Sequence, residues 1–154
     1  MRITLLILLL LPTTAARAAA GDGNGNACAL VTRDEATAAV GAAVGEGKLT
    51  SGGSMAGAGI DVSGCAFASA SRKELKVSLW RFSPSAKQSL DIYRGLCTKK
   101  EQAPGLGDIA CWYNERHHEL QVLKGTSLMI FELDRQPASE ALVTVAKQAL
   151  ARLK

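Results

Sequence analysis

The sequence contains none of the short motifs that mark the common enzyme classes. It has no G-x-S-x-G of a serine hydrolase, no H-E-x-x-H of a metalloprotease, no P-loop and no dinucleotide-binding fingerprint. Residues 105–108, GLGD, look superficially like a phosphate loop. A predicted strand rather than a helix follows them, so no helix dipole is available to a phosphate. We therefore predict no catalytic residues.

Signatures of metal and nucleic-acid binding are missing as well. The chain has four cysteines but no C-x-x-C pair, which disfavours a zinc site. It has no cluster of Lys or Arg, and its formal net charge is +4. We expect no metal, no cofactor and no nucleic-acid partner.

The N-terminus has the pattern of a secretory signal peptide. A basic start at Arg2 leads into the apolar residues 3–11, which are too few to span a bilayer, and then into small residues that end at Ala20. We predict cleavage after Ala20, with Ala18 as the second choice. No cysteine directly follows the apolar run, so we predict neither a lipoprotein anchor nor a membrane span in the mature chain.

The predicted organisation is a signal peptide (1–20), a flexible glycine-rich leader (21–27) and a single domain (28–154). Removal of Arg2 and Arg17 lowers the formal net charge from +4 to +2. The mature protein is expected in the periplasm or outside the cell, which are oxidising compartments where an even number of cysteines indicates disulfides.

The positions of the cysteines favour one of the three possible pairings, Cys28–Cys65 with Cys97–Cys111. Cys97 lies on the apolar face of a predicted helix, and Cys111 lies on the inferred core face of the next strand. A weak internal repeat relates residues 65–77 to 111–122, and Cys28 precedes the helix that belongs to the first copy. We infer two α-β-β halves, the second with an added strand and a closing helix.

Hydrophobic periodicity predicts an α+β fold. The expected structure is one antiparallel sheet of about five strands, with the second and third helices, and the first as well, on a single face. A capping box at Thr32 and Glu35 begins the first helix, which Gly45 or Gly47 ends. Strands are expected at 65–69 and 74–82 and three times within 105–134, and helices at 83–97 and from Pro137 onward.

Residues 47–64 are rich in Gly and Ser and read as a flexible surface loop, with a short strand possible at 48–50. A loop of this length in a compact domain also suggests a second interpretation, a mobile element that gates a ligand site.

Two neighbouring histidines, His117 and His118, stand beside a predicted hairpin turn. Adjacent strand residues point to opposite faces, so the pair is not expected to bind one ion. We interpret them as part of a solvated turn, with a surface metal or pH-sensing site as the alternative.

Aromatic residues suggest a binding face. Alternation places Trp80, Phe82 and Trp112 on the side of the sheet away from the helices, together with Leu123. Such a face is too apolar for water. Either the 47–64 segment, the leader or a partner chain covers it, or it binds an envelope ligand or protein.

Three short segments carry a family resemblance: the opening Cys28-Ala29-Leu30-Val31-Thr32-x-x-Glu35, then Gly64-Cys65-Ala66-Phe67, and then Gly105-Leu106-Gly107-Asp108-x-Ala110-x-Trp112. The chain resembles small secreted bacterial envelope proteins, many of them lipoproteins, of a domain-of-unknown-function family. That family implies no established reaction and no catalytic residues.

Two classes of function remain open. The favoured one is a non-catalytic binding or accessory protein of the cell envelope, whose ligand or partner is unknown. The alternative is a periplasmic hydrolase or secreted protease inhibitor with its active elements in loops.

Overall fold

The computed structural model describes residues 25–55, 57–134 and 138–153. The predicted signal peptide, residues 21–24 of the leader and the predicted helix start at Pro137 lie outside these ranges. The elements follow in the order η1 (Ala27–Ala29), α1 (Arg33–Val40), β1 (Lys48–Met55), β2 (Ile60–Ala68), β3 (Glu74–Phe82), η2 (Pro84–Ala86), α2 (Lys87–Cys97), β4 (Ile109–Trp112), β5 (Glu119–Lys124), β6 (Ser127–Leu133) and α3 (Ser139–Arg152).

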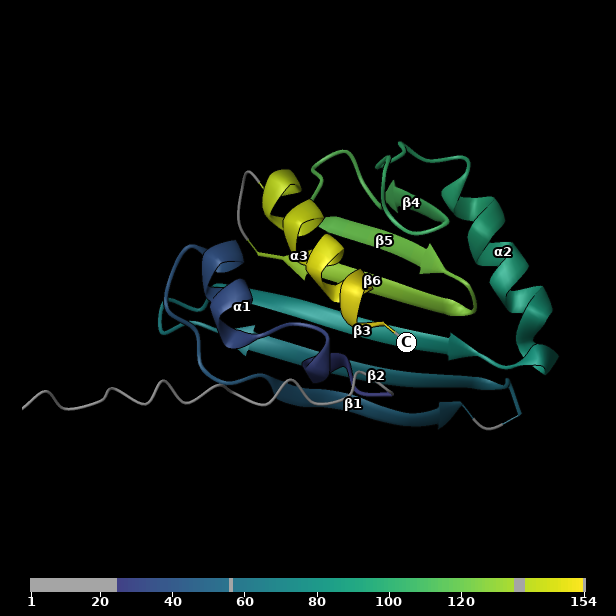
Figure 1. Cartoon of the computed structure of the whole chain (residues 1–154), viewed down its shortest axis with the longest axis horizontal. Helices are drawn as coiled ribbons and strands as arrows, with labels where there is room; N and C mark the ends of the chain where they lie inside the picture. Colours follow the sequence, from purple (N-terminus) through teal and green to yellow (C-terminus); the bar gives the residue numbers. More distant parts are fainter. Residues whose placement is uncertain (1–24, 56, 135–137, 154) are drawn as a thin grey trace, which may run out of the picture.

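The strands form one antiparallel sheet in the order β1-β2-β3-β6-β5-β4. Two meanders, β1-β2-β3 and β4-β5-β6, join where β3 pairs with β6 (Figure 1). Three helices pack against the sheet, so the fold class is α+β as predicted. The described residues contain six strands rather than about five, because each half contributes three.

The extra strand lies in residues 47–64, where the prediction of a flexible or ligand-gating loop is wrong. β1 occupies most of this segment and pairs with β2 from Lys48↔Ala66 to Met55↔Ile60. Gly and Ser have low β-propensity, so the local sequence hides the strand. The strand forms because its backbone completes a hydrogen-bonded ladder with β2, which needs no large side chains.

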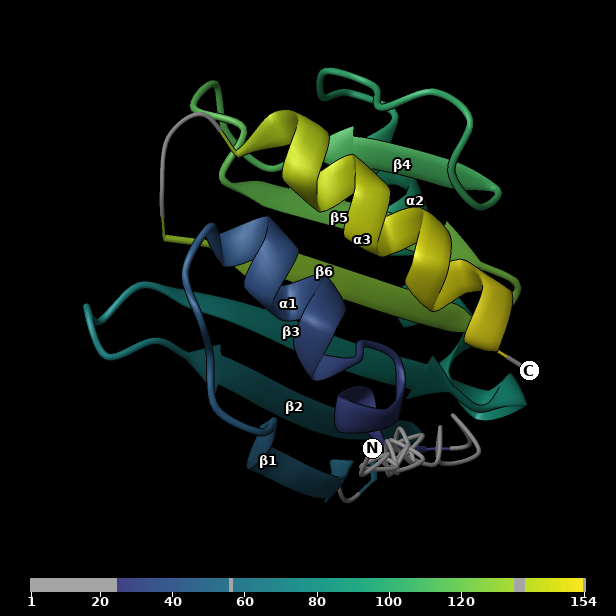
Figure 2. The same cartoon turned by 60° about the vertical axis from the view of Figure 1, so that its left-hand side comes forward.

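The helices lie on both faces of the sheet. Figure 2 shows α1 and α3 side by side on one face and α2 behind the sheet on the other. The prediction that the second helix shares a face with the third is therefore wrong. The chain crosses from β3, in the middle of the sheet, to β4 at the far edge, and it makes this crossing behind the sheet. We refer to these two surfaces as the α1/α3 face and the α2 face.

The α1/α3 face carries the larger core. Helix α1 begins with the predicted capping box, but it ends at Gly41 rather than at Gly45 or Gly47. Gly41 adopts φ +72°, a left-handed conformation that suits glycine and ends a helix. The largest fully buried side chains on this face come from the strands, both helices and the N-terminal segment: Leu30, Val40, Phe67, Leu75, Leu79, Leu120, Met129, Phe131, Leu133 and Leu142.

The α2 face carries a smaller core, beneath α2. Leu90 of the helix packs with Phe82, Leu123 and Leu128 of the sheet. Helix α2 covers three of the apolar residues that the sequence placed away from the helices: Trp80, Phe82 and Leu123.

Both predicted disulfides are present, and none of the cysteines is free. Cys28–Cys65 joins the segment before α1 to β2 on the α1/α3 face. Cys97–Cys111 joins the last residue of α2 to β4 on the α2 face. Each disulfide therefore fixes one helical segment to a strand of its own half, on opposite faces of the sheet.

A partly buried ion pair joins the two helices of the α1/α3 face. The guanidinium of Arg152 lies 2.6 Å from Oε1 of Glu35 and donates a further hydrogen bond to the Leu30 carbonyl. Burial alone would raise the pKa of the Glu35 carboxyl. The hydrogen bonds from Arg152 and from the Thr32 N–H, with the charge of Arg152, outweigh burial and lower this pKa below its ordinary value of 4.5.

This ion pair predicts a loss of stability in acid. A carboxyl whose pKa is lowered by folding stabilises the native state above its unfolded pKa, and this contribution is lost as the pH falls below about 4.5. Arg152→Gln should lower the free energy of unfolding at pH 7 by about 2 kcal/mol and flatten its decline between pH 5 and 3. Urea unfolding across that range measures both effects. An equally steep decline in the variant would contradict this assignment.

Candidate functional site

Helix α2 covers only part of its face of the sheet. Across the covered part runs an apolar cross-strand row, in which Trp80 pairs with Leu128 and Leu128 with Leu123. Four residues closer to the start of β3, the corresponding row is charged instead of apolar. There Lys76 pairs with Glu132, and Glu132 pairs with Glu119. We call the uncovered part the open half, and it consists of Glu74, Lys76, Ser78, Glu119, Gln121, Ile130 and Glu132.

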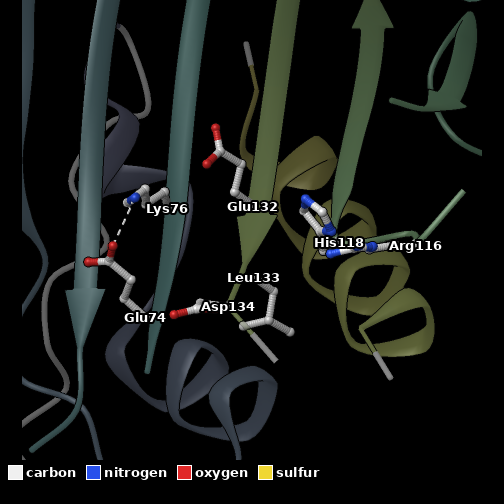
Figure 3. Close-up of a pocket in the computed structure, with 7 residues that line it drawn as sticks. All are labelled: Glu74, Lys76, Arg116, His118, Glu132, Leu133 and Asp134. Carbon is white, nitrogen blue, oxygen red and sulfur yellow. Dashed lines mark ion pairs between the residues drawn. The ribbon is translucent and has the colours of Figure 1, made fainter. Parts of the chain in front are cut away.

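An open cleft of about 380 Å³ lies at this end of the sheet. Strands β3 and β6 supply its floor, and the connection from β4 to β5 supplies one wall (Figure 3). This volume is at the lower end of the range for small-ligand sites. The lining residues are mostly charged: Glu74, Lys76, Arg116, His118, Glu132, Leu133 and Asp134.

Lys76 is the best-neutralised charge in the cleft. Its ammonium lies 2.9 Å from the carboxylate of Glu74, as Figure 3 shows. The hydrogen bond and charge of Glu74, followed by the charges of Glu132 and Asp134, raise the pKa of Lys76. Lys76 and Glu74 thus pair with each other, and the other charged groups of the lining are the carboxylates of Glu132 and Asp134 and the guanidinium of Arg116.

Two carboxylates of like charge lie directly opposite each other on β5 and β6. Glu119 pairs with Glu132, and both project from the α2 face. Burial, and secondarily the charge of Glu132, raise the pKa of the Glu119 carboxyl above its ordinary value, although a hydrogen bond from Gln121 opposes this shift. Like charges at opposed positions of a sheet are unfavourable unless a cation lies between or beside them.

The three aromatic residues proposed as a binding face do not share a face. Trp80 and Phe82 lie on the α2 face, where both rings contact Tyr93 of α2 at centroid distances of 5.7 and 5.8 Å. Trp112 lies on the α1/α3 face, is 7% exposed and belongs to the larger core. The prediction of one aromatic surface is wrong because it assumed that every helix covers the same face.

The two histidines have different partners. His117, at φ +53°, stacks on the Trp112 ring at 4.7 Å, and its Nε2 lies 2.8 Å from the Glu101 carboxylate. His118 Nε2 lies 3.2 Å from the Asn114 amide, and His118 lines the cleft. Across the described ranges, no three His, Cys, Asp or Glu side chains are arranged to hold a metal ion.

Sequence reasoning missed the cleft. Its floor combines Lys76 of β3 with Glu132 of β6, which lie about a third of the chain apart in the sequence before they pair. The available signal was that both residues occupy polar positions of alternating strands. Only the pairing of β3 with β6 brings them together, and no local turn or spacing predicts that pairing.

None of the helices in the described part of the chain is long and apolar enough to cross a membrane. No family model, curated protein or solved structure matches the chain. The resemblance to secreted envelope proteins therefore stays a prediction, and the geometry of the cleft has to carry the functional argument by itself.

Proposed function

We propose that this protein is an exported, non-catalytic binding domain of the cell envelope that holds an amine-bearing ligand on the open half. The observation that carries this proposal is the cleft, where Glu132 and Asp134 lie beside an already neutralised pair of Glu74 and Lys76. An ammonium group beside Glu132 would also relieve its repulsion with Glu119.

The cellular location follows from two independent features. The sequence of residues 1–20 has the pattern of a secretory signal peptide. The domain also carries two disulfides, which persist in oxidising compartments such as the periplasm or the extracellular space. The resemblance to secreted envelope proteins supports the same location.

Binding fits the cleft better than catalysis does. None of the described residues that line it is a Ser, Thr or Cys that could act as a nucleophile. The two strands of the cleft floor, β3 and β6, pair with each other and hold its side chains in place. A rigid floor of this kind suits a binding site that exists before the ligand arrives.

The test uses a small peptide with two ammonium groups, Ala-Lys-Ala with free ends, and isothermal titration calorimetry with the exported chain. We expect Glu132→Gln to weaken binding tenfold or more, because a charge-assisted hydrogen bond contributes about 1.5–3 kcal/mol. Ala-Ala-Ala, which lacks the side-chain ammonium, should bind more weakly than Ala-Lys-Ala.

The matched control is Glu140→Gln, which removes an exposed carboxylate from the first turn of α3, on the opposite side of the sheet. Its affinity should equal that of the wild type. If the wild-type protein does not bind the peptide, or if both variants weaken it equally, the cleft is not the site of an amine-bearing ligand.

A further inference from the structure

We propose that β1 is a self-association edge through which two copies of the chain form a symmetric dimer with one continuous sheet. This inference concerns the edge of the sheet farthest from β4 and is independent of the cleft. All eight residues of β1 are exposed, and within the described residues the strand pairs with β2 alone. An edge strand of this kind presents backbone groups that another strand can pair with.

The opposite edge of the sheet is closed. β4 has only four residues, and the chain just before it pairs along its outer side. The Trp112 N–H donates to the Glu101 carbonyl, and the Ala103 N–H donates to the Ala110 carbonyl. In the described part of the chain β1 is then the one open edge, so two copies that join β1 to β1 leave no further edge to pair, which gives a closed dimer rather than a fibre.

β1 lacks the charges that usually protect an edge. Its only charged residue is Lys48, at its first position. A bulge interrupts the pairing with β2 between Leu49 and Ser51, and from Ser51 to Met55 the register is regular. In an antiparallel pair of β1 strands centred on Gly53, the two Lys48 side chains lie at opposite ends, so the pairing brings no like charges together.

The segment from Ser51 to Met55 can pair with the same segment of a second copy. With Gly53 opposite its own copy, Met55 of one chain stands opposite Ser51 of the other, and both project from the α2 face. Beside Ser51 and Gly53 lies a shallow, open hollow of about 330 Å³ whose apolar lining is Val62, Trp80 and the chain's own Met55. Met55, which is 47% exposed, is the apolar side chain that can enter this hollow of the partner.

Sedimentation equilibrium of the exported chain tests the proposal. We expect the wild type to dimerise with a dissociation constant on the order of 100 µM, because a single strand pair buries a small area. Met55→Glu should weaken association at least tenfold, because it places a charge over an apolar hollow. The melting temperature should not change, since Met55 is exposed in the single chain.

A rescue and a matched control make the register testable. Combining Ser51→Lys with Met55→Glu places opposite charges across the strand pair and should restore most of the association. Leu49→Glu changes a residue of β1 that is 63% exposed but lies beyond the bulge, and it should have much less effect. A wild type that stays monomeric at 1 mM, or equal effects of Met55→Glu and Leu49→Glu, would overturn the proposal.

Discussion

Replacing both Cys28 and Cys65 by alanine should lower the free energy of unfolding by about 4 kcal/mol. The disulfide closes a loop of 37 residues, and the entropy model of crosslinking gives about this value for that length. Cys65 is also buried in the larger core, where its sulfur packs close to Phe67 and Gly47. A domain of this size has a total stability of about 5–15 kcal/mol, so the loss is a large fraction.

The Cys97–Cys111 disulfide supplies the comparison. It closes only 14 residues, so replacing both of its cysteines by alanine should cost less, about 3 kcal/mol. Urea unfolding followed by circular dichroism measures both variants against the wild type. A larger loss from the shorter loop would show that packing around the sulfur atoms, rather than loop closure, determines the effect.

Trp112→Ala should lower the free energy of unfolding by about 3–5 kcal/mol, as is usual for a buried aromatic residue. Its ring fills space in the core between the sheet and α3 and also stacks on His117. The substitution leaves a cavity that the paired strands β4 and β5 cannot close. Thermal and urea unfolding should both report this loss.

The neighbouring residue provides the control. Tyr113 follows Trp112 directly but is 52% exposed, with Lys100 over its ring. Tyr113→Ala should therefore cost less than about 1 kcal/mol. If Trp112→Ala instead left the melting temperature unchanged, Trp112 would belong to an exposed surface, and the assignment of the two faces in β4 would be wrong.

Local sequence signals predicted the elements that depend on near neighbours. The alternation of Leu75, Val77 and Leu79 gave β3 with its observed bounds, and the reciprocal bonds of Thr32 and Glu35 gave the start of α1. Both signals act within a few residues, so a single sequence contains them completely.

The assignment of faces failed because it placed all three helices on one side of the sheet. In the two similar hairpins, Glu74 comes nine positions after Cys65, whereas Glu119 comes eight positions after Cys111. Because side chains alternate along a strand, that difference turns Cys111 to the opposite face, while Val77 and Val122 stay on the same one. Cys111 faces α2, as the predicted disulfide with Cys97 requires, but α2 lies on the opposite face of the sheet from α3.

The candidate site could not be predicted because it depends on pairing between the two halves. β3 and β6 are joined by α2, β4 and β5, and nothing local to Lys76 or Glu132 specifies that they are partners. The strand β1 was missed for a related reason. Its Gly and Ser residues carry no strand signal, and its formation depends on the ladder with β2.

The central claim is that the open half of the α2 face is the binding surface. Mapping the backbone amide chemical shifts of the exported chain during titration with Ala-Lys-Ala tests it most directly. We predict that the largest changes fall in residues 74–78, 116–121 and 130–134, and that Glu132→Gln abolishes them at the same peptide concentration. Changes confined to β1, to α2 or to the surface of α1 and α3 would contradict the account.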